Sequence, residues 1–460
     1  MDKFYHSVRL DEELCKGCIN CIKRCPTQAI RVQDGKARIN KKFCIDCGEC
    51  IRTCPYKAKV AHTDSWDLLA EFKYTIALPA PSLYMQFDAN LYTRKHIVAA
   101  LKALGFDYIY EVARGAEIVT HQSNAYLRAY RGEFPLISSA CPAVVRLIQL
   151  RYPNLIPNLI PIKSPMEIAA QNARREFCAL NNVSPDEVGV FFLSPCAAKM
   201  TSTKAPLEVE RSNVDGVIPI KMVYFKLLKQ LAKMREDNVD EILLQAGKYG
   251  VRWASTGGEA LAIDTKKVLY VDGIQNVVKI LEDLEDDRIK AIDFIETSAC
   301  IGGCIGPLTV ENLYVAKNRN RQQMEDTPAF YREIEAEELR DTAWEKPLIH
   351  YDVSTLDPDM MKAMEKLRKM NEIYERLPAL DCGACGSPSC RALAEDVVRV
   401  CHHEERRRVH RPDYFAQIRY LARMTDCIFI LRRKIKRLAN EMMMFDNGFT
   451  DGTEEENENQ

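Results

Sequence analysis

The order of hydrophobic and polar positions predicts strands that alternate with helices from about residue 74 onward. Residues 75–78 form a short apolar run typical of a buried strand, and residues 188–193 form a longer one. Residues 96–104 instead repeat apolar side chains at the spacing of an amphipathic helix. Such alternation predicts an α/β core with parallel strands, in which functional loops lie at the carboxyl ends of the strands.

A further helix is predicted to begin at Pro165. Ser164 is a favoured N-cap residue, proline suits the first helical position, and Glu167 would complete a capping box. A charged stretch at 356–376 also predicts a helix, and a basic amphipathic helix is expected at 431–444.

The composition is that of an ordinary soluble protein, with 47% hydrophobic and 28% charged residues. Basic and acidic residues are balanced, at 64 and 65, so neither a nucleic acid nor an anionic membrane is an expected partner. No stretch approaches the ~20 apolar residues that span a bilayer, and the first residues contain no apolar signal core. We therefore expect a soluble, cytoplasmic protein.

Cysteine changes this picture, because the chain contains 18 of them, most in short regular clusters. Two runs share the spacing Cys-x-x-Cys-x-x-Cys-x-x-x-Cys-Pro, one beginning at Cys15 and one at Cys44. Bacterial ferredoxins hold two cubane clusters with this spacing, and the fourth cysteine of each run binds the other cluster. The expected ligand sets are Cys15, Cys18, Cys21 and Cys54 for one cubane, and Cys44, Cys47, Cys50 and Cys25 for the other.

A disulfide framework and a zinc ribbon are the alternatives for these two runs. The repeated spacing with a proline after each fourth cysteine favours iron–sulfur clusters over disulfides, which are also rare in a reducing compartment. A zinc ribbon would require its ligands in isolated pairs. The first segment is therefore predicted to be an α+β module that carries electrons.

Three further motifs, at 138–142, 194–199 and 296–307, bring four more cysteines into the predicted α/β core. Strands that end on such loops can bring Cys141, Cys196, Cys300 and Cys304 into one four-thiolate site. Gly302 and Gly303, inside the last motif, would let the backbone approach a large inorganic group. Structural zinc remains an alternative for this site.

These motifs resemble the three signature segments of the iron-only ([FeFe]) hydrogenases, and the resemblance covers about residues 1–345. It implies that the four cysteines hold a cubane and that Cys304 also bridges to a two-iron subsite with carbon monoxide, cyanide and dithiolate ligands. Together these form the H-cluster, which splits or makes H2. Lys199 matches the family lysine that donates a hydrogen bond to a subsite cyanide, with a solvated surface lysine as the alternative reading.

The chain departs from catalytic members of the family where protons are handled. The resemblance places Ala140 at the position of a relay cysteine, so that position has no titratable group. Ser194 and Ser298 replace two methionines that line the subsite, and two relay glutamates are replaced by Gln122 and Ser123. Loss of one acid–base group typically costs ~10²–10⁴-fold in rate. The departures favour slow, reversible reaction with H2, and detection of H2 over its metabolism.

A third cluster is predicted where Cys382, Cys385 and Cys390 run into a helix, since a helix N-terminus favours thiolate. It resembles the accessory [4Fe-4S] domain of sensory [FeFe]-hydrogenases, with Cys427 as the expected fourth ligand, Cys401 as its rival and zinc as the alternative metal. We expect the subgroup without a PAS domain, in which the signal passes to a partner protein.

The predicted cofactors are three [4Fe-4S] clusters, two ferredoxin-like and one accessory, together with the H-cluster. The predicted function is sensing or slow, reversible oxidation of H2, with electron transfer through the cubanes to a ferredoxin, a kinase or phosphatase, or hydrogenase subunits. Two alternatives remain open: a non-catalytic electron-transfer subunit of a hydrogenase complex, and an iron–sulfur assembly factor.

The expected domain order follows from these motifs. It is a two-cluster ferredoxin-like domain at 1–62, an H-cluster domain at 70–345, a linker helix at 346–378, an accessory [4Fe-4S] domain at 379–430, and a terminal helix with a disordered acidic tail at 431–460. Cys178, in an apolar helix end, is expected to be a core cysteine without a metal.

Overall fold

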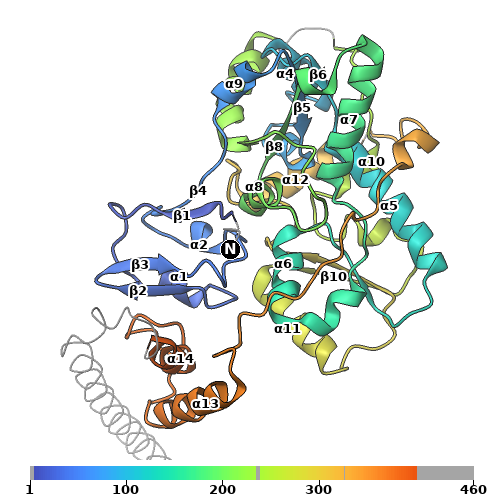
Figure 1. Ribbon diagram of the computed structural model, residues 1–460. Coiled ribbons are helices and arrows are strands. Elements are labelled where there is room, and N and C mark those ends of the chain that lie inside the picture. The colour runs from blue at the N-terminus through green and yellow to red at the C-terminus, as the bar shows by residue number, and fades with distance from the viewer. Residues whose placement is uncertain (1–4, 235–238, 326, 401–460) are drawn as a thin grey trace, which may run out of the picture. The chain divides into compact units, whose positions relative to one another are not determined.

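The computed structural model describes residues 5–234, 239–325 and 327–400 (Figure 1). The chain divides into two compact units, Met1–Val353 and Ser354–Gln460. No helix in the described part combines the length and apolar character needed to cross a bilayer. Cys401, Cys427, the predicted helix at 431–444 and the acidic tail lie outside the described residues.

The first unit begins with a small α+β module. Strand β1 pairs antiparallel with β4, and β2 pairs antiparallel with β3. Six of the eight cysteines of the two ferredoxin-like runs lie in loops between these elements, whereas Cys21 lies in the first short helix and Cys50 in the second. The elements are β1 (Val8–Leu10), α1 (Asn20–Lys23), β2 (Ile30–Gln33), β3 (Lys36–Ile39), α2 (Glu49–Arg52) and β4 (Lys59–Ala61).

The core that follows contains a four-stranded parallel sheet in the order β6-β5-β8-β9. Its strands are β5 (Tyr74–Pro79), β6 (Tyr108–Ile109), β8 (Val188–Ser194) and β9 (Gly216–Pro219). Alternate side chains of β8 enter different clusters: Phe191 packs with α4 (Arg94–Ala103) and α9 (Ile220–Lys233), and Val190 packs with α7 (Pro165–Asn181). Helices therefore cover both faces, which explains why every residue of β8 is buried.

A second parallel sheet has the order β10-β11-β7. Its strands are β7 (Leu136–Ile137), β10 (Val268–Asp272) and β11 (Phe294–Ser298). One face packs on α6 (Pro142–Arg151) and α11 (Ile274–Glu285), and the other packs on α5 (Val112–Ala129). A Cβ at Gly115 of α5 would lie 2.3 Å from the Pro165 carbonyl oxygen, so glycine permits the close pairing of α5 with α7.

The remaining described elements are shorter connections or lie in the second unit. They are η1 (Trp66–Glu71), α3 (Pro81–Tyr84), η2 (Pro153–Asn158), η3 (Pro185–Glu187), α8 (Ala197–Lys204), α10 (Lys248–Arg252), η4 (Ala260–Ala262), α12 (Leu313–Glu325), η5 (Ala336–Leu339), α13 (Met360–Glu375) and α14 (Cys390–Val400). In the second unit, α13 and α14 pack through Met370, Ala394 and Val398.

The predicted strands at 75–78 and 188–193 lie in β5 and β8, and the predicted helix at 96–104 overlaps α4. The helix predicted to begin at Pro165 is α7, but its capping box is wrong. Glu167 is fully buried, and its carboxylate accepts hydrogen bonds from the Ser212 hydroxyl and the Asn213 amide instead. These hydrogen-bond partners lie 45 and 46 residues from Glu167 in the sequence, so the local spacing of residues could not predict them.

The N-terminal module is held to the core by hydrogen bonds from several segments. The Ser7 hydroxyl donates to the Ala197 carbonyl at 2.8 Å, at the first residue of α8. Arg151 of α6 donates to the Pro26 carbonyl, and Gln275 of α11 donates to the Arg24 carbonyl. These bonds anchor the first cysteine run and the residue before β1 beside the core.

Candidate functional site

The three central cysteine motifs each follow a parallel strand at its carboxyl end. Strand β7 leads to Cys141, β8 leads to Cys196, and β11 leads to Cys300 and Cys304. These four cysteines line one pocket between the two sheets' loops, as the sequence predicts. The strand order thus joins segments that are far apart in the sequence.

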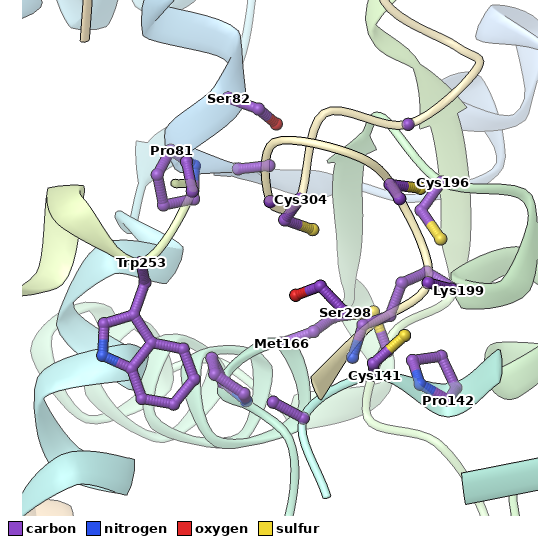
Figure 2. A pocket seen from close by; sticks show the side chains of 18 of the residues that line it. Pro81, Ser82, Cys141, Pro142, Met166, Cys196, Lys199, Trp253, Ser298 and Cys304 are labelled. Atoms are coloured by element: carbon purple, nitrogen blue, oxygen red, sulfur yellow. The ribbon is translucent and has the colours of Figure 1, made fainter. Parts of the chain in front are cut away.

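The pocket encloses about 980 Å³ that protein atoms leave free, including its opening. Figure 2 shows Cys304, Ser298 and Cys141 around this space, with Lys199 on one side and Trp253 across from it. Phe192, Met166 and Val112 add apolar surface to the lining. The surface that Cys304 exposes belongs to the pocket.

Burial dominates the acid–base properties of the pocket thiols. It raises the pKa of Cys196 to about 11 and that of Cys304 to about 12, and neighbouring thiols add to both rises. Cys196 is the N-cap residue of α8, where the helix dipole favours thiolate. A nearby positive charge, such as bound iron, would favour the thiolates of Cys196 and Cys304 against the effect of burial.

Four thiolates can hold either a tetrahedral zinc ion or a cubane, so zinc stays the alternative metal for this site.

Lys199 lies in the pocket wall with only 7% of its surface exposed. Its Nζ has no hydrogen-bond partner among the described residues. Burying an unpaired ammonium is costly, so this atom fits a site that receives an anionic ligand. The alternative reading of Lys199 as a solvated surface lysine is wrong.

The glycines of the last motif act differently from the prediction. Gly303 lines the pocket, but a Cβ there would meet the Ala254 carbonyl oxygen at 2.4 Å. Its φ of +112° also favours glycine. Gly302 is not among the lining residues, and a Cβ there would meet Leu313. Glycine at both positions lets the loop pack closely against neighbouring protein atoms, and of the two only Gly303 lines the pocket.

The residues that are predicted to differ from those of catalytic relatives lie in different environments. Ala140 and Ser298 line the pocket. Ser194 does not, because its hydroxyl accepts from the Cys196 amide at 3.0 Å and donates to the Cys196 carbonyl, bracing the loop. On α5, Gln122 donates to Thr342 and to the Leu339 carbonyl, and Ser123 is buried.

Sequence reasoning missed two carboxyl groups in the pocket wall, Glu259 and Glu296. Burial raises the pKa of Glu259 to about 8, and the charge of Glu296 adds to the rise. The Ser138 hydroxyl donates to Glu259 at 2.6 Å and accepts from the Ala140 amide. Glu296 accepts from the amides of Gly257, Glu259 and Ala260, which fixes it at the start of η4.

No signal in the sequence identifies this pair. The Ser138–Glu259 hydrogen bond joins residues 121 positions apart, and Glu259 lies outside the predicted motifs. Glu296 begins the motif at 296–307, but nothing in the sequence distinguishes its carboxyl group as part of the pocket wall. Ser138 belongs to a predicted motif, but its hydroxyl partner emerges only from the fold.

The eight N-terminal cysteines form two groups in the structure. Burial raises the pKa of Cys21, and the thiols of Cys18, Cys54 and Cys15 add to the rise. Burial also raises the pKa of Cys44 and Cys47, with Cys50 and Cys25 adding to it. The structure therefore brings together the two predicted sets, with Cys54 and Cys25 exchanged; their binding of iron stays a prediction.

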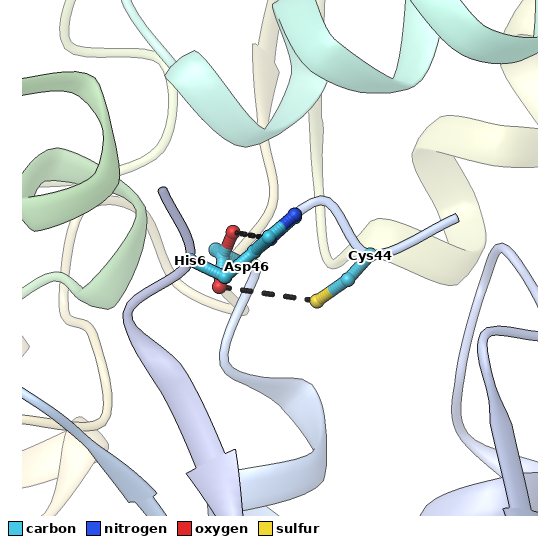
Figure 3. A group of neighbouring side chains, drawn as sticks. All are labelled: His6, Cys44 and Asp46. Carbon is cyan, nitrogen blue, oxygen red and sulfur yellow. Dashed lines mark hydrogen bonds and ion pairs between the residues drawn. The ribbon is translucent and has the colours of Figure 1, made fainter. Parts of the chain in front are cut away.

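A buried hydrogen bond between His6 and Asp46 braces the second set (Figure 3). His6 Nδ1 lies 2.7 Å from Asp46 Oδ2, and the other Asp46 oxygen accepts from the Val8 amide at 2.9 Å. The Cys44 thiol approaches the same oxygen at 3.8 Å. Because both carboxylate oxygens have partners, the group fixes the N-terminal strand against the cysteine loop and leaves Cys44 to the predicted cluster.

The second unit contains the three described cysteines of the accessory motif. Cys390 is buried at the start of α14, and its amide donates to Asp381 at 2.6 Å. Cys385 has its pKa raised by burial, and the thiols of Cys382 and Cys390 add to the rise. Three predicted ligands are thus close together, and both candidates for the fourth lie outside the described residues.

Family comparisons match the same three segments. The description "Iron only hydrogenase large subunit, C-terminal domain" matches residues 73–265 and 259–307. A 4Fe-4S dicluster domain matches residues 7–55, and an Fe-S cluster domain matches residues 377–400. The predicted fold class, a dicluster module followed by an α/β core and a C-terminal iron–sulfur region, is confirmed.

Individual relatives are distant. Iron hydrogenase 1 of Clostridium pasteurianum is 27% identical over 255 residues, which cover 45% of this chain and 44% of that protein, so the chain spans less than half its length. The periplasmic [Fe] hydrogenase large subunit of Nitratidesulfovibrio vulgaris is 26% identical over 359 residues, which cover 65% of this chain and 85% of that protein.

A cytosolic Fe-S cluster assembly factor of Yarrowia lipolytica is 25% identical over 218 residues, which cover 45% of this chain and 41% of that protein. A solved [FeFe]-hydrogenase structure from Chlamydomonas reinhardtii covers 55% of this chain and 84% of its own, with 17% identity and a TM-score of 0.40.

The ligand assignment predicts a specific loss of iron. Cys300→Ala should lower the iron content of the anaerobically reconstituted chain by about four atoms, because a cubane needs its four thiolates. Iron and zinc are measured by plasma mass spectrometry. Cys178→Ala is the matched control, since Cys178 lies half-buried at the end of α7, away from the pocket lining. Unchanged iron in Cys300→Ala, or loss of zinc instead, would contradict the assignment.

Proposed function

The chain belongs to the family of iron-only hydrogenases, and we propose that it holds an H-cluster in the central pocket and reacts slowly and reversibly with H2. It would pass the resulting electrons through its other iron–sulfur clusters to a partner protein, and so report the presence of H2. The observation that carries this proposal is the set of four thiols around one pocket whose wall contains a buried, unpaired Lys199 ammonium.

The residues of the pocket suit the parts of this cofactor. Cys141, Cys196, Cys300 and Cys304 would bind the cubane, and Cys304 would also bind the two-iron subsite. Lys199 would donate a hydrogen bond to an anionic ligand of that subsite. When bound, the subsite supplies the chemistry that splits H2 into protons and electrons. The apolar side chains of Phe192, Met166 and Trp253 limit the access of water.

Glu259 is the group in the pocket that can exchange the proton. Ala140 has no titratable atom at the position of the relay cysteine. Glu259 lies in the same wall, and its pKa of about 8 keeps it protonated at neutral pH but able to lose the proton at modest cost. The Ser138 hydroxyl holds the carboxyl in place at 2.6 Å. A substitute acid in a different position is consistent with slow turnover.

Electrons would leave through the N-terminal module. Cys47, in the second cysteine set, lines the same pocket as Cys300 and Cys304. The second predicted cubane is therefore next to the central site, with the first cubane beyond it. The accessory cluster of the second unit and an external partner, such as a ferredoxin, a kinase or phosphatase, or hydrogenase subunits, would complete the route.

A second candidate function is that of an electron-transfer subunit that carries cubanes without the two-iron subsite. Ala140 at the relay position and the hydroxyl of Ser194, which braces its own loop, favour this candidate. Lys199 favours the H-cluster, because its Nζ has no hydrogen-bond partner among the described residues and a cyanide of the two-iron subsite would accept a hydrogen bond there.

Infrared spectroscopy tests the proposal against this second candidate. After anaerobic reconstitution and maturation with a synthetic diiron complex, the full chain should show carbonyl and cyanide bands that shift under H2. Lys199→Met should weaken or abolish them, because the ammonium no longer holds the cyanide ligand, whereas Lys204→Met, at the end of α8, should not. Cubane iron without any such bands would establish the electron-transfer subunit.

A second test concerns proton exchange. A carboxyl with a pKa of about 8 accepts protons only above that pH, so H2 oxidation should increase as the pH rises through about 8 and proton reduction should decrease. Glu259→Gln should slow both directions by about 10²-fold and remove this pH step.

Dye-linked H2 oxidation, measured from neutral to alkaline pH, provides the readout. Glu285→Gln is the control, because this glutamate is exposed on α11 outside the pocket lining. A Glu259→Gln chain that retains both the rate and the pH step would exclude Glu259 as the acid–base group.

A further inference from the structure

Arg52 connects the second cysteine run to the last motif of the central site. It is the final residue of α2, between Cys50 and Cys54, and its Nη2 donates to the Ile305 carbonyl at 3.1 Å. Ile305 directly follows Cys304. This hydrogen bond spans 253 positions and joins a ligand loop of one predicted cubane to a ligand loop of the next.

The two loops are packed closely even without this side chain. A Cβ at Gly48 would lie 2.8 Å from Pro307 Cγ, so the second run already touches the end of the last motif. Cys47 lines the central pocket beside Cys300 and Cys304. A neutral side chain could supply one more hydrogen bond to a carbonyl, so tethering alone does not explain a guanidinium here.

The charge of Arg52 has no carboxylate partner within the described residues. The structure records no ion pair for its guanidinium there, whereas Arg94 and Arg114 are each paired with glutamates. Glu49, one turn earlier in α2, interacts with Arg52 electrostatically but without an ion-pair contact. Burial raises the pKa of Cys300, and Arg52 is the main charge that opposes the rise. The guanidinium therefore acts on a predicted ligand of the central cubane.

We propose that Arg52 is a positioning residue that stabilises the reduced form of the central cubane and so sets how readily this cubane exchanges electrons with the neighbouring ferredoxin-like cubane. A cluster gains one negative charge on reduction, and a nearby positive charge in a site of low dielectric constant favours that state. The hydrogen bond to Ile305 fixes the guanidinium at this position. The inference rests on the central cubane of the proposed function but does not require the two-iron subsite.

The test is an EPR-monitored redox titration of the full chain reconstituted with iron and sulfide. The central signal is the one that disappears in Cys300→Ala. Arg52→Gln should shift the midpoint potential of this signal to a lower value. Arg52→Lys keeps the positive charge, so it should stay close to wild type. Arg38→Gln, at an exposed position of β3 in the same module, is the control and should change nothing.

The outcomes separate this inference from the proposed function. An unchanged central potential in Arg52→Gln, or an equal decrease in Arg52→Lys, would overturn the role of the charge while leaving the central cubane in place. If Arg52→Gln does not retain its iron, the comparison of Arg52→Lys with wild type decides, because a decrease there also contradicts a role for charge. A wild-type chain with no signal that depends on Cys300 would refute the central cubane and this inference with it.

Discussion

Four cysteine thiols from three separate loops that line one pocket are the constraint on which this structure depends. Burial raises the pKa of Cys196 and Cys304 to about 11 and 12, so a bound metal would be needed to favour their thiolates. Three parallel strands from two sheets end at this point, and their loops supply the ligands. Helices α5 and α7 pack closely on each other and against both sheets, which holds these strand ends in place.

The charged and titratable side chains in and beside the pocket have different roles. Lys199 offers a cation on one side, and Arg52 offers another at the boundary with the N-terminal module. Glu259 is a carboxyl kept neutral by burial, in the wall where Ala140 leaves the family's relay position without a proton donor. The four predicted ligand cysteines line the pocket together, whereas the acid in its wall is Glu259 and not a residue at position 140.

The sequence predicted features that depend on local spacing, such as the cysteine runs and the apolar strands. It did not predict contacts between residues that are far apart in the sequence. Regular cysteine spacing and the strands before each motif placed the ligand sets, and the apolar runs placed β5 and β8. Glu259 and Arg52 could not be found in this way, because their partners lie 121 and 253 positions away. The capping box predicted for Glu167 is wrong for a similar reason, since the partners of its carboxylate lie 45 and 46 positions away. The Ser194 hydroxyl bonds within its own loop, to the amide and the carbonyl of Cys196.

Iron-edge anomalous diffraction from crystals of the reconstituted and matured chain would test the central claim most directly. The account predicts a cubane held by Cys141, Cys196, Cys300 and Cys304, with a further pair of iron atoms bound through Cys304 on the side of Lys199. A single metal ion at these four sulfurs, or a pocket with protein side chains filling the space beside Lys199, would contradict it.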